Sequence, residues 1–203
     1  MNGPTVFVVD DDPAVRDSLA LLLEEGNFAV ETFDSADAFL AAGRPAPCSC
    51  AIVDIRMPGM DGMQLQAELS RRGVRLPLIF LTGHGDISLS VRAIKAGAID
   101  FLTKPVTGTA LLESVQLALL ESERLRTQAE TMQVAAARVA CLTEREREVM
   151  VLAVEGLANK EIARRLGISH RTVEIHKARV MHKTGADTLI DLARIAEAGR
   201  LRP

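Results

Sequence analysis

The chain has 203 residues, of which 48% are hydrophobic and 25% are charged, and its formal net charge is −3. This length allows one large domain or two small ones. No apolar run is long enough to span a membrane and residues 1–4 are too short for a signal peptide, so we expect a cytoplasmic protein without membrane partners. Cys48, Cys50 and Cys141 are consistent with reduced thiols. Half a metal site at Cys48-Ser-Cys50 is the alternative, but no other ligands cluster near it.

Charge is distributed unevenly along the chain. Residues 141–203 carry 12 Lys and Arg and 9 Asp and Glu. Residues 1–140 carry 12 Lys and Arg and 18 Asp and Glu. An acidic segment joined to a basic one favours a regulatory domain attached to a nucleic-acid-binding domain. The absence of Trp and Tyr argues against recognition of single strands by base stacking.

The first 120 residues alternate between short apolar runs and helical patterns. The runs predict strands at residues 5–9, 29–33, 51–54, 78–81 and 99–102. The intervening patterns predict helices at residues 13–25, 36–42, 63–72, around 91–95, and at 110–120. Asp12 and Ser35 are expected N-caps of the first two helices. Strict alternation of strand and helix predicts an α/β fold with a doubly wound, five-stranded parallel sheet.

Polar side chains gather at or just past the carboxyl ends of these predicted strands. They are Asp10, Asp11, Asp54, Thr82 and Lys104. In the flavodoxin-like strand order 2-1-3-4-5 they converge on one crevice. Carboxylates packed together repel and require a cation, and Mg²⁺ fits because it takes a few carboxylates and bridges to phosphate oxygens. Lys104 and Thr82 would then meet the oxygens of a transferred phosphoryl group.

Residues 4–122 resemble the receiver domain of two-component response regulators. The resemblance rests on the acidic cluster, the Asp-x-Arg-Met-Pro-Gly-Met-Asp-Gly stretch that starts at Asp54, the Thr-Gly-His-Gly-Asp stretch that starts at Thr82, and Lys104-Pro105. It implies that Asp54 accepts phosphate from a sensor histidine kinase. It also implies that Asp11, Asp54 and the backbone carbonyl of Arg56 bind Mg²⁺, with Asp10 acting through water, and that the Lys104–Pro105 bond is cis. Val106 departs from the family, where Phe is frequent, and we expect a change in packing only.

Two residues near this cluster have competing interpretations. Phe101 fits ordinary strand packing. In receivers, however, an aromatic residue here swings inward when the phosphoryl group attracts the Thr hydroxyl, which would make Thr82 and Phe101 a switch. His84 stands between two glycines and is interpreted as a loop residue without a catalytic role.

The last third of the chain is entirely helical in pattern. Residues 121–140 contain no Gly or Pro and predict a solvated helix that continues the preceding one. Four helices follow, with a capping box at Thr143 and expected N-caps at Asn159 and Ser169. The middle two form a helix-turn-helix. We therefore expect a first domain at residues 1–122, a helical linker at 123–140 and a small all-α domain at 141–203.

The motifs Leu-Thr-x-Arg-Glu, Gly-x-x-Asn-Lys-x-Ile-Ala and Thr-Val-x-x-His resemble the LuxR-type helix-turn-helix, and the whole chain resembles a response regulator of the FixJ/NarL subfamily. The helix after Ser169 would enter the major groove of double-stranded DNA. Phosphate contacts are expected from basic side chains, and base contacts from the positions that match the family. Some members carry Lys where this chain has Glu174 and Ala178, so the operator sequences of those members cannot be assigned to this protein. The residues expected at the DNA are Lys160, His170, Arg171, Thr172, Glu174, Ile175, Lys177, Ala178 and Arg179, with Glu174, Ile175 and Ala178 at the base-reading positions.

The implied function is transcription regulation switched by phosphorylation. Phosphorylation of Asp54 would promote homodimerisation and sequence-specific DNA binding, with contact to RNA polymerase left open. The protein is not expected to be an enzyme, apart from catalysing its own phosphorylation and dephosphorylation. A phosphatase of the haloacid-dehalogenase type, with Asp10 as nucleophile and Asp12 as acid/base, leaves Asp54 and the helix-turn-helix unexplained. A DNA-binding module whose receiver no longer accepts phosphate is disfavoured, because the chain has all five polar residues of the predicted site, Asp10, Asp11, Asp54, Thr82 and Lys104.

Overall fold

A computed structural model of the chain describes residues 4–43, 48–83 and 87–199. The chain divides into two units, Met1–Arg126 and Thr127–Pro203, here called the N-terminal and C-terminal units. Among the described residues, no helix has both the length and the apolar character that a membrane crossing requires. His84 lies outside the described residues.

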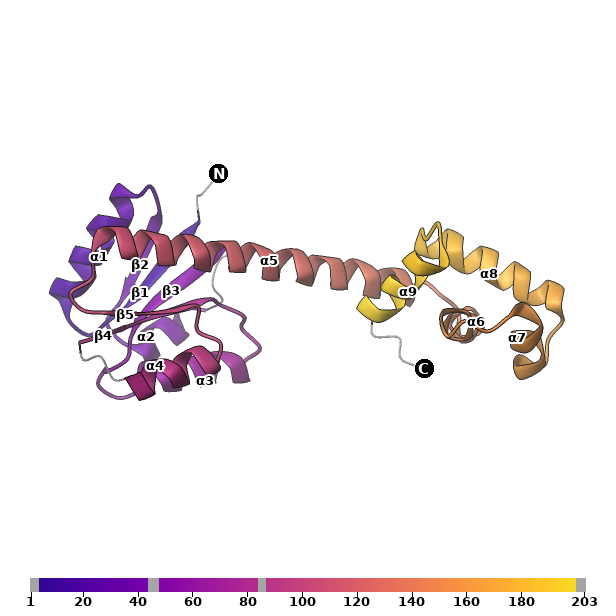
Figure 1. Cartoon of the computed structure of the whole chain (residues 1–203), viewed down its shortest axis with the longest axis horizontal. Coiled ribbons are helices and arrows are strands. Elements are labelled where there is room, and N and C mark those ends of the chain that lie inside the picture. Colours follow the sequence, from indigo (N-terminus) through magenta and orange to yellow (C-terminus); the bar gives the residue numbers. More distant parts are fainter. Residues whose placement is uncertain (1–3, 44–47, 84–86, 200–203) are drawn as a thin grey trace. The chain divides into compact units, whose positions relative to one another are not determined.

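The N-terminal unit is built on a parallel sheet with the strand order β2-β1-β3-β4-β5, which confirms the predicted order. Figure 1 shows helices on both sides of the sheet. The strands are β1 (Thr5–Val9), β2 (Ala29–Phe33), β3 (Ser49–Asp54), β4 (Leu78–Thr82) and β5 (Asp100–Thr103). The helices are α1 (Pro13–Glu25), α2 (Ala36–Ala41), α3 (Gly62–Arg71), α4 (Ile87–Lys95) and the beginning of α5 (Gly108–Ala140).

The central strands are buried on both faces, which explains their unbroken apolar runs. One face packs against α1 and α5 through residues such as Val6, Ile52 and Leu81. The other face packs against α2, α3 and α4 through residues such as Val53 and Phe80. Because successive side chains of a strand point to opposite faces, each run supplies both halves of the core.

Local capping chemistry fixes where several helices begin. Asp12 accepts a hydrogen bond from the Ala14 amide at 2.9 Å, so the predicted N-cap of α1 is confirmed. Helix α3 starts one residue earlier than predicted because Asp61 forms a capping box with Gln64. A Cβ atom at Gly62 would lie 2.5 Å from the Asp54 carbonyl oxygen. The absence of a side chain there allows α3 to start directly against the end of β3.

The C-terminal unit contains α6 (Glu144–Val154), α7 (Asn159–Leu166), α8 (His170–Thr184) and α9 (Leu189–Ala198), together with the end of α5. Helix α5 is unbroken from residue 108 to residue 140, as the predicted helical continuation requires. Gly167 ends α7 in the left-handed conformation, with φ 65°, and the chain turns into α8. This places α7 and α8 in the predicted helix-turn-helix arrangement.

One predicted N-cap in this unit is wrong. Thr143 and Ser169 cap α6 and α8 as expected. Helix α7, however, is capped at Ala158, and Asn159 is its first helical residue. The Glu161 carboxylate accepts a hydrogen bond from the Ala158 amide at 2.9 Å. The amide at the cap therefore has a hydrogen-bond partner although Ala158 has no polar side chain.

Candidate functional site

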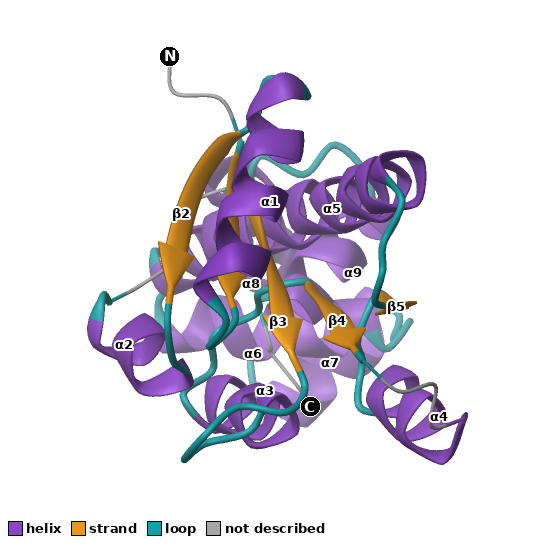
Figure 2. Ribbon diagram, turned by 90° about the vertical axis from the view of Figure 1, so that its left-hand side faces the viewer, coloured by secondary structure: helices purple, strands orange, loops and turns teal. Residues whose placement is uncertain are grey.

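The parallel strands of the sheet end at one edge (Figure 2). Four of the five polar residues predicted to converge lie at or directly after these strand ends. Asp10 follows β1, Asp54 is the last residue of β3, Thr82 is the last residue of β4, and Lys104 follows β5. The Lys104 amide donates to the Thr82 carbonyl oxygen at 2.7 Å, which fixes the backbone at the start of the β5–α5 connection. The Lys104–Pro105 bond is cis, as predicted.

The centre of the cluster is the Lys104 ammonium. Its Nζ atom lies 2.6 Å from Asp10 Oδ2 and 2.7 Å from Asp54 Oδ1. Asp10 is 1% exposed and Asp54 is 5% exposed. Two carboxylates that are almost completely buried therefore share one cation, which offsets their mutual repulsion.

Backbone amides hold the other oxygen of each carboxylate. Asp54 Oδ2 accepts from the Arg56 amide at 2.7 Å, and Asp10 Oδ1 accepts from the Asp12 amide at 3.0 Å. The Asp10 carbonyl oxygen accepts from Arg16 Nη1 at 2.6 Å, a contact that the sequence pattern did not reveal. The two amide bonds orient the carboxylates, and the Arg16 bond holds the backbone at Asp10.

Burial and charge act against each other at this site. Burial raises the pKa of the Asp54 carboxyl above its usual value, while hydrogen bonds from Lys104 and from the Arg56 amide oppose the rise. Burial by itself lowers the pKa of Lys104, but hydrogen bonds to Asp10 and Asp54 outweigh it, so the Lys104 pKa stands above its usual value. The site therefore favours the charged form of Lys104, whereas burial makes the charged form of Asp54 less favourable than in water despite the nearby ammonium.

The expected metal ligands differ in exposure, since Asp10 and Asp54 are buried and Asp11 is exposed. No group of three or more His, Cys, Asp or Glu side chains among the described residues is arranged to hold a metal ion. A pocket of about 630 Å³ is lined by Asp11, Arg56, Asp61 and Arg92, among others. The donor chemistry fits Mg²⁺, which binds hard oxygen atoms, uses one or two carboxylates in most sites, and keeps several waters.

The predicted switch residues lie on the last two strands. Thr82 is 2% exposed, and Phe101 is partly buried against the core cluster on the side of α2, α3 and α4. Asp100 was missed by the sequence analysis. Its carboxylate accepts from the Phe101 amide at 2.7 Å and from Ser114 Oγ on α5 at 2.5 Å. One side chain thus ties β5 to α5 directly beside Phe101.

The cysteines show no sign of a metal site within the described part of the chain. All three are free thiols. The hydrogen bond to Glu123 raises the pKa of Cys48, and burial raises that of Cys50 to about 12. Asp12, the acid/base of the phosphatase alternative, is exposed and serves as the cap of α1.

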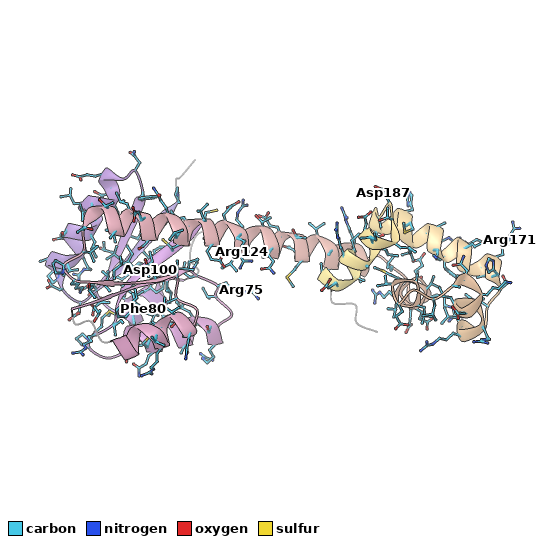
Figure 3. All side chains as sticks on the ribbon, in the orientation of Figure 1. Arg75, Phe80, Asp100, Arg124, Arg171 and Asp187 are labelled. Carbon is cyan, nitrogen blue, oxygen red and sulfur yellow. The ribbon has the colours of Figure 1, made fainter. Side chains whose placement is uncertain are left out.

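The second predicted surface is the outer face of α8. Val173 and Val180 face the core, whereas most residues predicted to contact DNA are exposed. Figure 3 shows Arg171 near the start of α8, projecting away from the helix. The exposed members of the predicted set are Lys160, His170, Arg171, Glu174, Ile175, Ala178 and Arg179, and the intermediate ones are Thr172 and Lys177.

Two contacts on this face were not anticipated. Lys177 Nζ donates to Asn159 Oδ1 at 3.1 Å, which links the two helices of the helix-turn-helix. His170 Nδ1 lies 3.5 Å from Glu174 Oε1, one helical turn away. Asn159 therefore has a tertiary role in place of the capping role expected from its residue type.

Sequence comparisons agree with both halves of this description. Residues 6–116 match the family described as response regulator receiver domain, and residues 140–196 match the family of bacterial regulatory proteins, luxR family. The transcriptional regulatory protein FixJ of Azorhizobium caulinodans is 46% identical over 98% of this chain and 94% of its own length. FixJ of Rhizobium meliloti is 41% identical, with complete coverage of both chains.

Solved structures give the same result. The response regulator StyR is 44% identical, with a TM-score of 0.81 and coverage of 96% of this chain and 98% of its own. Full-length FixJ from B. japonicum is 40% identical, with a TM-score of 0.60 and complete coverage of both chains. The chain therefore belongs to the response regulators that join a receiver domain to a LuxR-type DNA-binding domain.

Proposed function

We propose that Asp54 accepts a phosphoryl group from a sensor histidine kinase and that phosphorylation controls DNA binding by the C-terminal unit. The observation that carries this proposal is the Lys104 ammonium, held within 2.7 Å of both Asp10 and Asp54. A fixed cation beside a buried carboxylate suits a reaction in which negative charge is brought to that carboxylate. No turnover of an external substrate is proposed, because the group transferred remains on the protein until it is hydrolysed.

In the proposed step, a carboxylate oxygen of Asp54 attacks the phosphorus atom of a phosphohistidine. A new P–O bond forms, the P–N bond breaks, and the kinase histidine leaves with the electron pair of that bond. Lys104 lies where it can balance charge on the phosphoryl oxygens, and the Arg56 amide holds Asp54 in place. Asp11, Asp54 and the Arg56 carbonyl would hold Mg²⁺ with Asp10 acting through water, and the ion would neutralise further charge there.

We propose that Thr82 and Phe101 relay the change to a surface used for pairing. The phosphoryl group adds roughly −1.5 to −2 charges to an acidic site, so the nearby hydroxyl and ammonium groups must rearrange around it. Helix α4 leaves Val91 and Ile94 each 47% exposed, and Leu117 on α5 is 57% exposed. Exposed apolar side chains of this kind support a face that pairs with a second copy of the chain.

Pairing would bring together two helix-turn-helix units on one stretch of double-stranded DNA. Two linked units can occupy half-sites about one helical turn apart, and the second contact is strengthened by the first. The exposed basic residues of α7 and α8 support phosphate contacts. The proposed function places the protein in the cytoplasm, and contact with RNA polymerase would follow promoter binding.

The first test is labelling with acetyl phosphate and Mg²⁺, followed by mass spectrometry of intact protein. Wild type should gain one phosphoryl group, and Asp54→Asn should gain none. Asp12→Asn is a matched control, because Asn also caps helices well and the exposed cap lies outside the proposed chemistry. Equal labelling of Asp54→Asn and wild type would place the nucleophile elsewhere. Loss of labelling in Asp12→Asn alone would favour the phosphatase alternative.

A further inference from the structure

The exposed side of α8 carries one acidic side chain, Glu174, and one large apolar side chain, Ile175, among its basic residues. With 100° between successive residues, the face opposite Val173 and Val180 contains Arg171, Ile175 and Ala178, and Glu174 lies beside them. The surrounding basic residues suit the phosphate backbone. Glu174 and Ile175 do not, so they call for a different partner.

The Glu174 carboxylate is available to a ligand. Its side chain is 56% exposed, and its contact with His170 Nδ1 is long, at 3.5 Å, and is an ion pair only when His170 is protonated. A carboxylate accepts hydrogen bonds and cannot donate them. In the major groove only cytosine N4 and adenine N6 carry N–H donors, and the adenine donor adjoins the N7 acceptor, which repels a carboxylate. Cytosine is therefore the base that this side chain suits.

Ile175 is the neighbouring residue and has the opposite chemistry. Its apolar side chain is 45% exposed. The only apolar group that a base pair presents in the major groove is the C5-methyl group of thymine. Because Glu174 and Ile175 are consecutive on the same exposed face, they can reach adjacent base pairs when α8 occupies the groove.

We propose that Glu174 and Ile175 specify the operator, Glu174 by accepting a hydrogen bond from cytosine N4 and Ile175 by packing on the methyl group of an adjacent thymine. This inference rests on the proposed DNA-binding function and adds the identity of the bases. Each half-site then contains a cytosine next to a thymine. A good side chain–base match discriminates against the wrong base by about five- to 150-fold.

Selection from random DNA duplexes tests the Glu174 assignment. The full chain is used after treatment with acetyl phosphate and Mg²⁺, and wild type is compared with Glu174→Gln and Glu174→Lys. Wild type should select cytosine at one position of each half-site. Glu174→Gln should select adenine there, because an amide suits adenine N6 and N7, and Glu174→Lys should select guanine. Glu197→Gln, at an exposed position on α9, is the matched control and should select the wild-type motif.

Replacement of thymine by uracil in the selected duplex tests the Ile175 assignment. Loss of the methyl group should weaken binding of wild type and leave binding of Ile175→Ala unchanged. If the Glu174 variants select the wild-type base at every position while all three proteins bind DNA, the Glu174 assignment is overturned and the proposed function stands. Equal sensitivity of wild type and Ile175→Ala to uracil overturns the Ile175 assignment. Failure of wild type to bind any duplex overturns the proposed function and this inference together.

Discussion

Replacing Glu146 by Gln measures what a buried ion pair contributes to the stability of the C-terminal unit. Glu146 is 2% exposed, and its carboxylate accepts from Lys183 Nζ at 2.7 Å and from the Thr143 amide at 2.9 Å. Gln has nearly the same volume and can still accept from the Thr143 amide. The substitution therefore removes the charge while retaining the capping box of α6.

The expected loss in the free energy of unfolding can be estimated from the lowered pKa of the Glu146 carboxyl. The hydrogen bond from Lys183, helped by the Thr143 amide, lowers the pKa of Glu146 from 4.5 to about 2. A lowering by about 2.5 pH units corresponds to at most about 3 kcal/mol in the free energy of unfolding at neutral pH. Because the Lys183 side chain is 35% exposed, solvent screens the pair, and we expect about 1–2 kcal/mol. The folded-state pKa is depressed, so this contribution is fully present above pH 4.5 and is lost as the pH falls toward 2.

Native-state hydrogen exchange of the full chain is the appropriate assay, because it reports on α6 and α8 separately from the N-terminal unit. Protection of amides in these helices should fall about five- to thirty-fold in Glu146→Gln at neutral pH. At about pH 3, the difference in free energy of exchange between wild type and Glu146→Gln should be less than half of its value at neutral pH. Glu144→Gln, at an exposed position in the same first turn, should change protection little. Equal protection of wild type and Glu146→Gln at neutral pH would refute the reasoning.

Three further predictions address the proposed switch and the DNA surface. Thr82→Ala should still be phosphorylated but should dimerise poorly, and sedimentation that shows equal dimerisation of the phosphorylated variant and wild type would contradict the proposed relay. Lys104→Met should slow labelling of Asp54 by about a hundred-fold, since it removes the cation shared by both carboxylates, and an unchanged labelling rate would exclude this role. Lys177→Ala should weaken binding to every duplex and flatten the slope of log affinity against log salt by about one unit. A loss on one sequence with the slope unchanged would show that Lys177 contacts bases.

The sequence was most informative where structure depends on near neighbours. The apolar runs located all of the strands in the described sheet, although β5 begins at Asp100, one residue later than predicted. The caps Asp12, Thr143 and Ser169 could be predicted because their bonds join residues two or three positions apart. The apolar runs placed the site residues at strand ends, and alternation of strand and helix implied a parallel sheet. Their convergence was predicted only on the condition of the strand order 2-1-3-4-5, which the structure has.

Contacts between distant residues were not predictable in the same way. Asn159 is a favoured N-cap by residue type, yet its side chain meets Lys177 eighteen residues away. The Asp100–Ser114 and Lys183–Glu146 contacts likewise depend on how helices pack. No periodic pattern encodes which side chains meet across such an interface, because periodicity identifies a buried face and leaves the partner on the opposing face undefined.

The spacing of the polar cluster along the chain also has a consequence for its biosynthesis. Asp10 and Lys104 are 94 residues apart in sequence. At roughly 5–20 residues per second, the ribosome adds Lys104 about 5–20 seconds after Asp10. During that interval Asp54 is added as well, and both carboxylates lack the ammonium group that holds them together in the finished fold. On the proposed function, a ribosome-bound fragment that ends before Lys104 is therefore a poor acceptor for the kinase, and efficient phosphorylation is limited to chains in which Lys104 has been translated.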